Sequence, residues 1–77
     1  LRHGGSAALE QRLAKITEQM ASGERHIARQ RDIIAELERS DRPAGYARYL
    51  LAGLEILQAA RQNFRSQLLK ELSKNSN

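Results

Sequence analysis

The sequence has no cysteine, no tryptophan, one proline and one phenylalanine in 77 residues. Without cysteine it can form neither a disulfide nor a thiolate metal site. A chain this short buries only about 60% of the surface that its unfolded form exposes, so a folded monomer would be marginally stable, and self-association is the simplest remedy. An apolar fraction of 40% with 4% aromatic residues favours helices packed through aliphatic side chains. We expect no strands.

Long apolar runs are also missing from the sequence. No stretch approaches the roughly 20 apolar residues of a transmembrane helix, and no short apolar segment follows a basic start as in a secretory signal. We therefore expect a cytoplasmic protein. Residues 1–5 begin without methionine and contain a glycine pair, so we expect them to be a disordered N-terminal segment, either a remnant of expression or a processed end.

The charge is basic but not concentrated. The net charge is +4, which raises the hypothesis of an anionic partner such as nucleic acid. A surface for it would combine Arg25, Arg29 and Arg48 with Tyr46 and Tyr49, and Arg61 and Arg65 could extend it. Acidic residues are interspersed among these, however, and no run of like charge forms a block. A solvated helix face is the favoured interpretation, and nucleic-acid binding is the alternative.

The first half of the chain contains a regular apolar stripe. Its members recur in unbroken steps of four and three residues: Leu9, Leu13, Ile16, Met20, Gly23, Ile27, Gln30, Ile34 and Leu37. This spacing is typical of a coiled-coil seam. It predicts a helix over residues 6–39, with Ser6 as its N-cap. The pair Ser22 and Gly23 could divide this helix and give three helices, but the apolar phase is the same on both sides, which favours one continuous helix.

Helix-breaking residues are concentrated at 40–44, which predicts a turn there. Pro43 suits the first position of a second helix, expected over residues 43–73 and followed by a frayed tail at 74–77. A short turn between two long helices makes them antiparallel. The fold class predicted is therefore all-α, an antiparallel two-helix hairpin with coiled-coil-like packing, as a single domain over residues 6–73.

The register of the hairpin can be predicted by pairing residues whose numbers sum to about 87. Phe64 would then fill the space at Gly23, and Ile34 the space at Gly53, so that large residues face small ones. The apolar arc of the second helix approaches half its circumference, which is typical of a helix with more than one neighbour. We therefore expect two copies to form a four-helix bundle. The expected interface residues are Leu50, Leu51, Leu54, Leu57, Phe64, Leu68, Leu69, Ile27, Ile34 and Leu37.

Polar residues near the seam could specify alignment. Gln30 occupies a seam position, Glu55 and Gln58 lie near it across the predicted hairpin, and His26 flanks it. These four form a candidate polar layer, and the alternative is that Gln30 extends to solvent. His26 has no carboxylate to orient it as a catalyst or ligand, and a helical di-iron site needs Glu where the chain has Gly23. We expect no catalytic residue, no metal ligand and no cofactor.

The segments GERHIARQRDIIAELER, AGLEILQ and LLKEL carry a resemblance that covers about residues 20–72. In these segments the chain resembles short uncharacterised helical-hairpin proteins of rhizobial and related alphaproteobacteria. The turn of that family contains Gly-His-Asp-Thr, where this chain has Asp41, Arg42, Pro43 and Ala44, a departure that removes a threonine cap. The resemblance implies a bacterial cytoplasmic hairpin and brings no activity with it.

Taken together, these patterns favour a protein that is not an enzyme. The function expected is a helical association module that forms homodimers and can dock a further protein partner through a groove between its helices. The alternative is a small basic regulator that associates with nucleic acid. A phosphorelay role would depend on His26 alone and is the weakest hypothesis. No membrane partner is expected.

Overall fold

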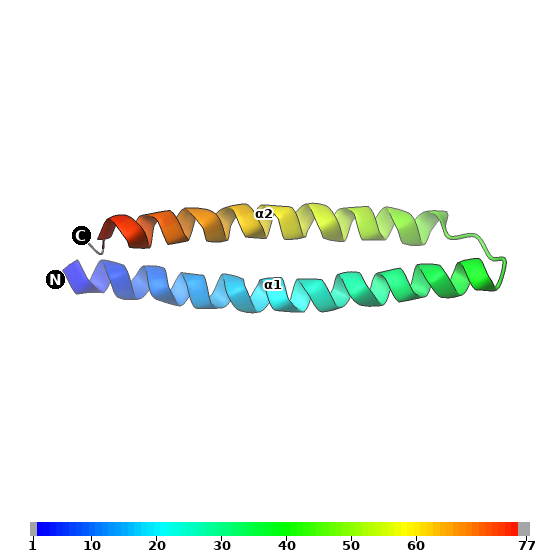
Figure 1. Ribbon diagram of the computed structural model, residues 1–77, viewed down its shortest axis with the longest axis horizontal. Helices are drawn as coiled ribbons and strands as arrows, with labels where there is room; N and C mark the ends of the chain where they lie inside the picture. The colour runs from blue at the N-terminus through cyan, green and yellow to red at the C-terminus, as the bar shows by residue number, and fades with distance from the viewer. Residues whose placement is uncertain (1, 76–77) are drawn as a thin grey trace.

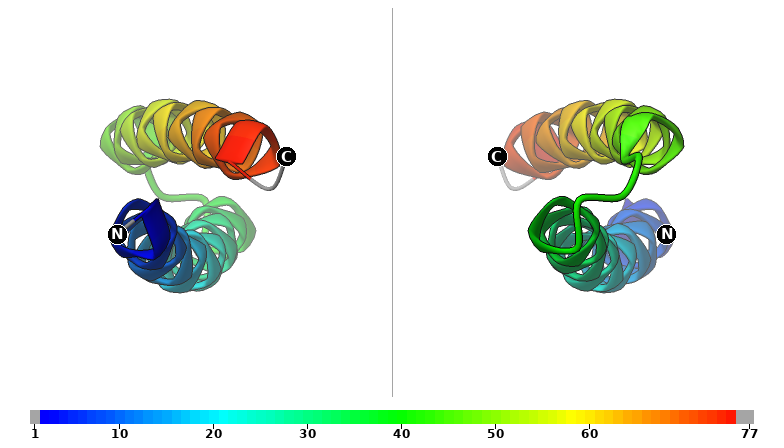
Figure 2. Two further views of the ribbon diagram at one scale, coloured as in Figure 1. Left: turned by 90° about the vertical axis from the view of Figure 1, so that its left-hand side faces the viewer. Right: turned by 90° about the vertical axis from the view of Figure 1, so that its right-hand side faces the viewer.

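The computed structural model describes the backbone of residues 2–75 and the surroundings of the side chains of residues 7–74. It contains two helices, α1 (Arg2–Arg39) and α2 (Gly45–Asn75), which lie antiparallel along a rod measuring 60 × 14 × 13 Å (Figure 1). The start of α1 and the end of α2 lie side by side at the end opposite the turn. The all-α hairpin is confirmed. Views along the rod show one pair of helices, with no third element among the described residues covering either of them (Figure 2).

The helix ends differ from the predicted ones. Helix α1 begins at Arg2, so Ser6 lies inside the helix rather than at its N-cap position, and residues 2–5 are helical where disorder was expected. Once a helix has formed, each added residue gains one backbone hydrogen bond, which extends it past a favourable cap residue. Helix α2 begins at Gly45, two residues after the predicted Pro43, and continues to Asn75. Residue 1 and the tail positions 76–77 lie outside the described residues.

Helix α1 runs through Gly23 without a break, as the constant apolar phase predicted. Gly23 is buried, and every member of the stripe from Leu9 to Leu37 is buried or half-buried. The seam of α1 is therefore the predicted one.

The turn is a Schellman motif built on an aspartate. The amide of Arg42 donates to the carbonyl of Leu37 at 2.8 Å, and the amide of Asp41 donates to that of Glu38 at 3.1 Å. This pair of bonds is the signature of a helix whose chain reverses through one left-handed residue, most often glycine. Here the left-handed residue is Asp41, with φ 56°. Helix α2 then starts at once, with the amide of Arg48 donating to the carbonyl of Ala44 at 2.9 Å.

The seam of α2 is the main correction to the predicted register. The residues that turn toward α1 from α2, and from Ala44 directly before it, are all buried or half-buried. They again recur in steps of three and four: Ala44, Ala47, Leu51, Leu54, Gln58, Arg61, Arg65, Leu68 and Leu72. The predicted seam residues Leu50, Leu57 and Phe64 are exposed instead. The predicted pairings of Phe64 with Gly23 and of Gly53 with Ile34 are wrong, because α2 is rotated about its axis relative to the predicted orientation.

The turn and the ion pairs fix this orientation. Ala44 and Ala47 pack against Ile34 beside the turn, with Leu37 and Leu51 around them. Two alanines let the helices approach closely there. Two ion pairs cross one side of the hairpin: Arg48 with Glu38 near the turn, and Arg31 with Glu55 at 3.0 Å farther along. These pairs are exposed, and each contributes at most about 1 kcal/mol, so they select the register more than they stabilise the fold.

Candidate interaction surface

Helix α2 has a second apolar stripe that α1 does not cover. Its members are spaced by four, three, four, three and four residues, and all are exposed: Tyr46, Leu50, Gly53, Leu57, Ala60 and Phe64. We refer to these six residues as the apolar stripe. Each one directly precedes a residue of the seam, so the stripe lies one residue, or about 100°, around the helix from it. Two seams about a right angle apart are what a helix in a four-helix bundle presents to its two neighbours.

The composition of the two seams is unusual, because the more apolar one is exposed. The covered seam of α2 includes Gln58, Arg61 and Arg65 in its central part, all half-buried. The apolar stripe has no polar side chain except the phenol of Tyr46. A contiguous exposed patch of this kind marks an interaction surface in soluble proteins.

Large side chains contribute most of the exposed area of the apolar stripe. Tyr46 is 74% exposed, Leu50 41%, Leu57 45% and Phe64 47%. Two more apolar side chains extend the surface along its outer edge, Tyr49 and Ile56, with exposed fractions of 74% and 71%. The rings of Tyr46 and Tyr49 stack with centroids 6.4 Å apart and planes inclined by 23°. Together these side chains cover the turn-proximal two-thirds of α2.

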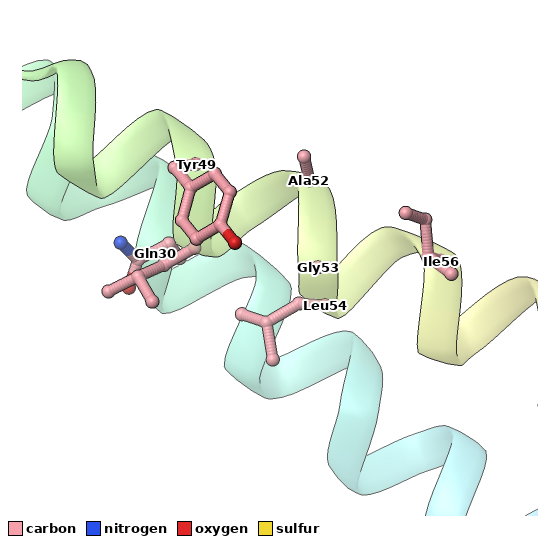
Figure 3. Close-up of a pocket in the computed structure, with 7 residues that line it drawn as sticks. Gln30, Tyr49, Ala52, Gly53, Leu54 and Ile56 are labelled. Carbon is pink, nitrogen blue, oxygen red and sulfur yellow. The ribbon is translucent and has the colours of Figure 1, made fainter.

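Two hollows lie along the stripe. The larger, about 570 Å³, is lined by the bare backbone of Gly53, by Tyr49, Leu54 and Ile56 of α2, and by Gln30 of α1 (Figure 3). The smaller, about 130 Å³, lies where α1 meets the ring of Phe64. Its α1 walls are Arg12, Lys15, Ile16 and Gln19. Both hollows are open to solvent. The larger is lined mainly by apolar side chains, and the smaller combines Ile16 and Phe64 with polar residues of α1, so both are shaped to receive side chains from another helix.

The hairpin exposes more surface than a compact monomer of its size. Its accessible surface is 6073 Å². A folded monomer of 8.7 kDa exposes about 4,700 Å², so the excess is about 1,300 Å². The radius of gyration of the Cα atoms is 17.6 Å, against about 11.5 Å for a compact domain of this length. No large side chain among the described residues is fully buried. A stable protein interface buries about 800 Å² on each partner, which the excess can supply.

The four residues of the predicted polar layer do not meet in one layer. Gln30 donates through Nε2 to the carbonyl of Ala47 at 3.0 Å, beside the turn. Gln58 donates through Nε2 to the carbonyl of Met20 at 2.8 Å, in the middle of the hairpin. Each glutamine therefore crosses the seam separately and bonds to the backbone of the opposite helix.

The other two members of that layer lie on the surface, where Glu55 pairs with Arg31 and His26 is exposed. Of the expected interface residues, Leu50, Leu57, Phe64 and Leu69 are exposed in the hairpin. The remaining six are buried or half-buried between α1 and α2: Ile27, Ile34, Leu37, Leu51, Leu54 and Leu68. The sequence prediction missed Arg61 and Arg65 as seam residues. Counting heptads from Ala44 rather than from Leu50 would have found them.

Metal-ligating groups do not come together in the part of the chain that the structure describes. Within that part, no three His, Asp or Glu side chains lie close enough to hold a metal ion. Neither α1 nor α2 has an apolar stretch long enough to cross a membrane. No family model, curated protein or solved structure matches the sequence. The resemblance to the rhizobial hairpin family stays a prediction.

Proposed function

We propose that this protein is an association module whose function is to form a homodimeric four-helix bundle through the apolar stripe of α2. The single observation that carries the proposal is the exposed stripe, an all-apolar heptad seam presented about 100° from the covered seam. The dimer is a non-enzymatic scaffold, and a further protein could dock in its grooves. The excess surface of about 1,300 Å² per chain supports association.

The mass in solution tests this proposal. Sedimentation equilibrium or light scattering of the full chain at micromolar concentration should give twice the chain mass of 8.7 kDa. A monomeric species with the helical circular dichroism of the folded hairpin would overturn it.

A pair of matched variants tests whether the stripe is the surface used. Leu57→Glu places a carboxylate in the centre of the stripe, where pairing would have to desolvate it. Ala59→Glu places the same charge on an exposed position of α2 outside the stripe and outside the seam. We expect Leu57→Glu to be monomeric and Ala59→Glu to stay dimeric. If both variants dimerise as tightly as the parent chain, the contact lies elsewhere.

Nucleic-acid association is the alternative function. Four of the thirteen basic residues already pair with carboxylates, namely Arg31, Arg39, Arg48 and Lys74, which lowers the charge available for phosphates. A basic regulator would bind duplex DNA or RNA at low salt, with affinity falling steeply as salt is added. Salt-sensitive binding of this kind by a monomeric chain would favour the alternative over the scaffold.

A further inference from the structure

We infer that the second copy lies with its α2 antiparallel to the first α2, both centred level with residue 55, so that Tyr46 meets Phe64 of the second copy. The inference rests on the proposed homodimer and specifies its orientation and register. It follows from a symmetry in the spacing of the stripe. The steps of four, three, four, three and four residues read the same in both directions, so the stripe superimposes on its own reverse.

The reversed stripe is complementary in size. With residue 55 as the centre, Leu50 falls opposite Ala60 of the second copy, and Gly53 falls opposite its Leu57. Each of these layers places a large side chain against a small one, which is how facing helices fill space without voids or overlap. The outer layer pairs the two aromatic rings of Tyr46 and Phe64, at both ends of the contact. A twofold axis repeats every pair.

The opposite orientation fits poorly. In a parallel pair each residue faces itself, so Gly53 would face Gly53 and leave a void, while Phe64 would face Phe64 and force the helices apart. Voids and overpacking each destabilise a packed interface. A foreign helix could in principle match the stripe, but the reversed stripe of this chain already matches it in size, with Leu50 opposite Ala60 and Gly53 opposite Leu57, which favours a second copy as the occupant.

Both hollows are filled in the antiparallel register. Leu57 of the second copy enters the hollow at Gly53, between Tyr49, Leu54 and Ile56 (Figure 3). Tyr46 of the second copy reaches the smaller hollow beside Phe64. The walls of that hollow include Arg12, Lys15 and Gln19, which offer polar partners for a phenol hydroxyl. This accounts for tyrosine at position 46, since a buried tyrosine needs a partner for its hydroxyl.

Disulfide cross-linking can determine the register of the two α2 helices in the dimer, because the chain has no cysteine of its own and engineered cysteines are the only ones that can react. The double variant Leu50→Cys with Ala60→Cys should form a covalent dimer with two disulfides on oxidation by copper–phenanthroline in air. Within one helix the two positions are about 15 Å apart, too far for an internal disulfide. Each single variant is the matched control. In the antiparallel dimer, residue 50 lies about 15 Å along the axis from residue 50 of the second copy, so neither single variant should cross-link efficiently.

A second measurement needs no substitution. In a mixture of isotope-labelled and unlabelled chains, a filtered nuclear Overhauser experiment should show contacts between the ring of Phe64 and the ring of Tyr46. Along one helix these rings are about 27 Å apart, so any such contact joins two chains. The single phenylalanine makes the Phe64 end of the contact unambiguous.

The outcomes separate this inference from the proposed function. A dimer by mass in which single variants cross-link and the Phe64 to Tyr46 contact is missing would overturn the antiparallel register and leave the homodimer standing. A dimer that gives the double-variant cross-link and the ring contact supports both. A monomeric, folded parent chain removes the homodimer, and the register falls with it.

Discussion

Gln58 of α2 occupies the space that the absent side chain of Gly23 leaves in α1. A methyl group at Gly23 would overlap Oε1 of Gln58 and approach Nη1 of Arg61. In this position Gln58 Nε2 donates to the carbonyl of Met20 at 2.8 Å, while Oε1 is buried without a hydrogen-bond donor. Gly23, in the middle of a long helix, is therefore a packing position. Glycine lowers the helix propensity there, but its missing side chain leaves room for the amide of Gln58 to cross the seam.

The contact between Gly23 and Gln58 predicts that substitutions at these two positions have strongly non-additive effects on the free energy of unfolding. Alanine is favoured over glycine in a helix interior by about 1 kcal/mol. In the parent chain, Gly23→Ala forces Gln58 out of the seam and breaks its bond to Met20, a loss of about 1 kcal/mol, so the substitution should be neutral or destabilising. In a Gln58→Ala background the same change should stabilise the fold by about 1 kcal/mol. Urea unfolding at one fixed protein concentration measures both. Equal effects of Gly23→Ala in the two backgrounds would show that Gln58 does not occupy the space.

The turn gives a second prediction, at Asp41. Its φ of 56° is left-handed, which strains an L-residue and which glycine adopts at no steric cost. Asp41→Gly should raise the free energy of unfolding by about 0.5 kcal/mol, because the relief of strain exceeds the added entropy of the unfolded chain. Asp41→Val should lower it by about 1 kcal/mol or more, since a β-branched residue is the least compatible with this backbone. Thermal unfolding of both variants provides the measurement. If the glycine and valine variants were equally stable, residue 41 would not be left-handed and the Schellman motif would be contradicted.

The ion pair between Arg31 and Glu55 should contribute little. Both side chains are about half exposed or more, and their contact at 3.0 Å is open to water and salt. We expect Glu55→Gln to lower the free energy of unfolding by less than about 0.5 kcal/mol at low salt, and by still less in 1 M NaCl. Denaturant titrations at two salt concentrations provide the comparison. A loss above about 1.5 kcal/mol that persists in 1 M salt would mean that the pair stabilises the hairpin itself.

The seam of α1 could be predicted from the sequence because α1 has only one apolar heptad. All nine predicted positions, from Leu9 to Leu37, are turned toward α2. The continuity of α1 at Gly23 was predictable for the same reason. A break would have shifted the apolar phase, and the phase is constant.

The orientation of α2 could not be predicted in the same way, because α2 has two heptads one residue apart. The one beginning at Tyr46 is the more apolar, and hydrophobicity alone therefore selects it as the seam. The geometry of the turn instead directs the other heptad, which begins at Ala44, toward α1. A left-handed Asp41 and a helix start at Gly45 bring Ala44 and Ala47 against Ile34, and the phase of α2 follows from there. Aspartate is a weak sequence signal for a left-handed residue, so this geometry was not visible in advance.

The final prediction links stability to association. If the apolar stripe is buried only in the dimer, dilution must shift the equilibrium toward unfolded monomers, and a tenfold dilution should lower the melting temperature by roughly 3–6 °C. The Leu57→Glu variant, which cannot bury its carboxylate, should melt at a lower temperature that no longer depends on concentration. The Ala59→Glu variant, with the same charge outside the stripe, should retain the concentration dependence of the parent. Melting curves recorded by circular dichroism from 1 to 100 μM protein measure this concentration dependence for the parent chain and both variants. A melting temperature of the parent chain that stays constant over this range would mean that the hairpin is stable alone, and that the exposed stripe contributes nothing to its folding.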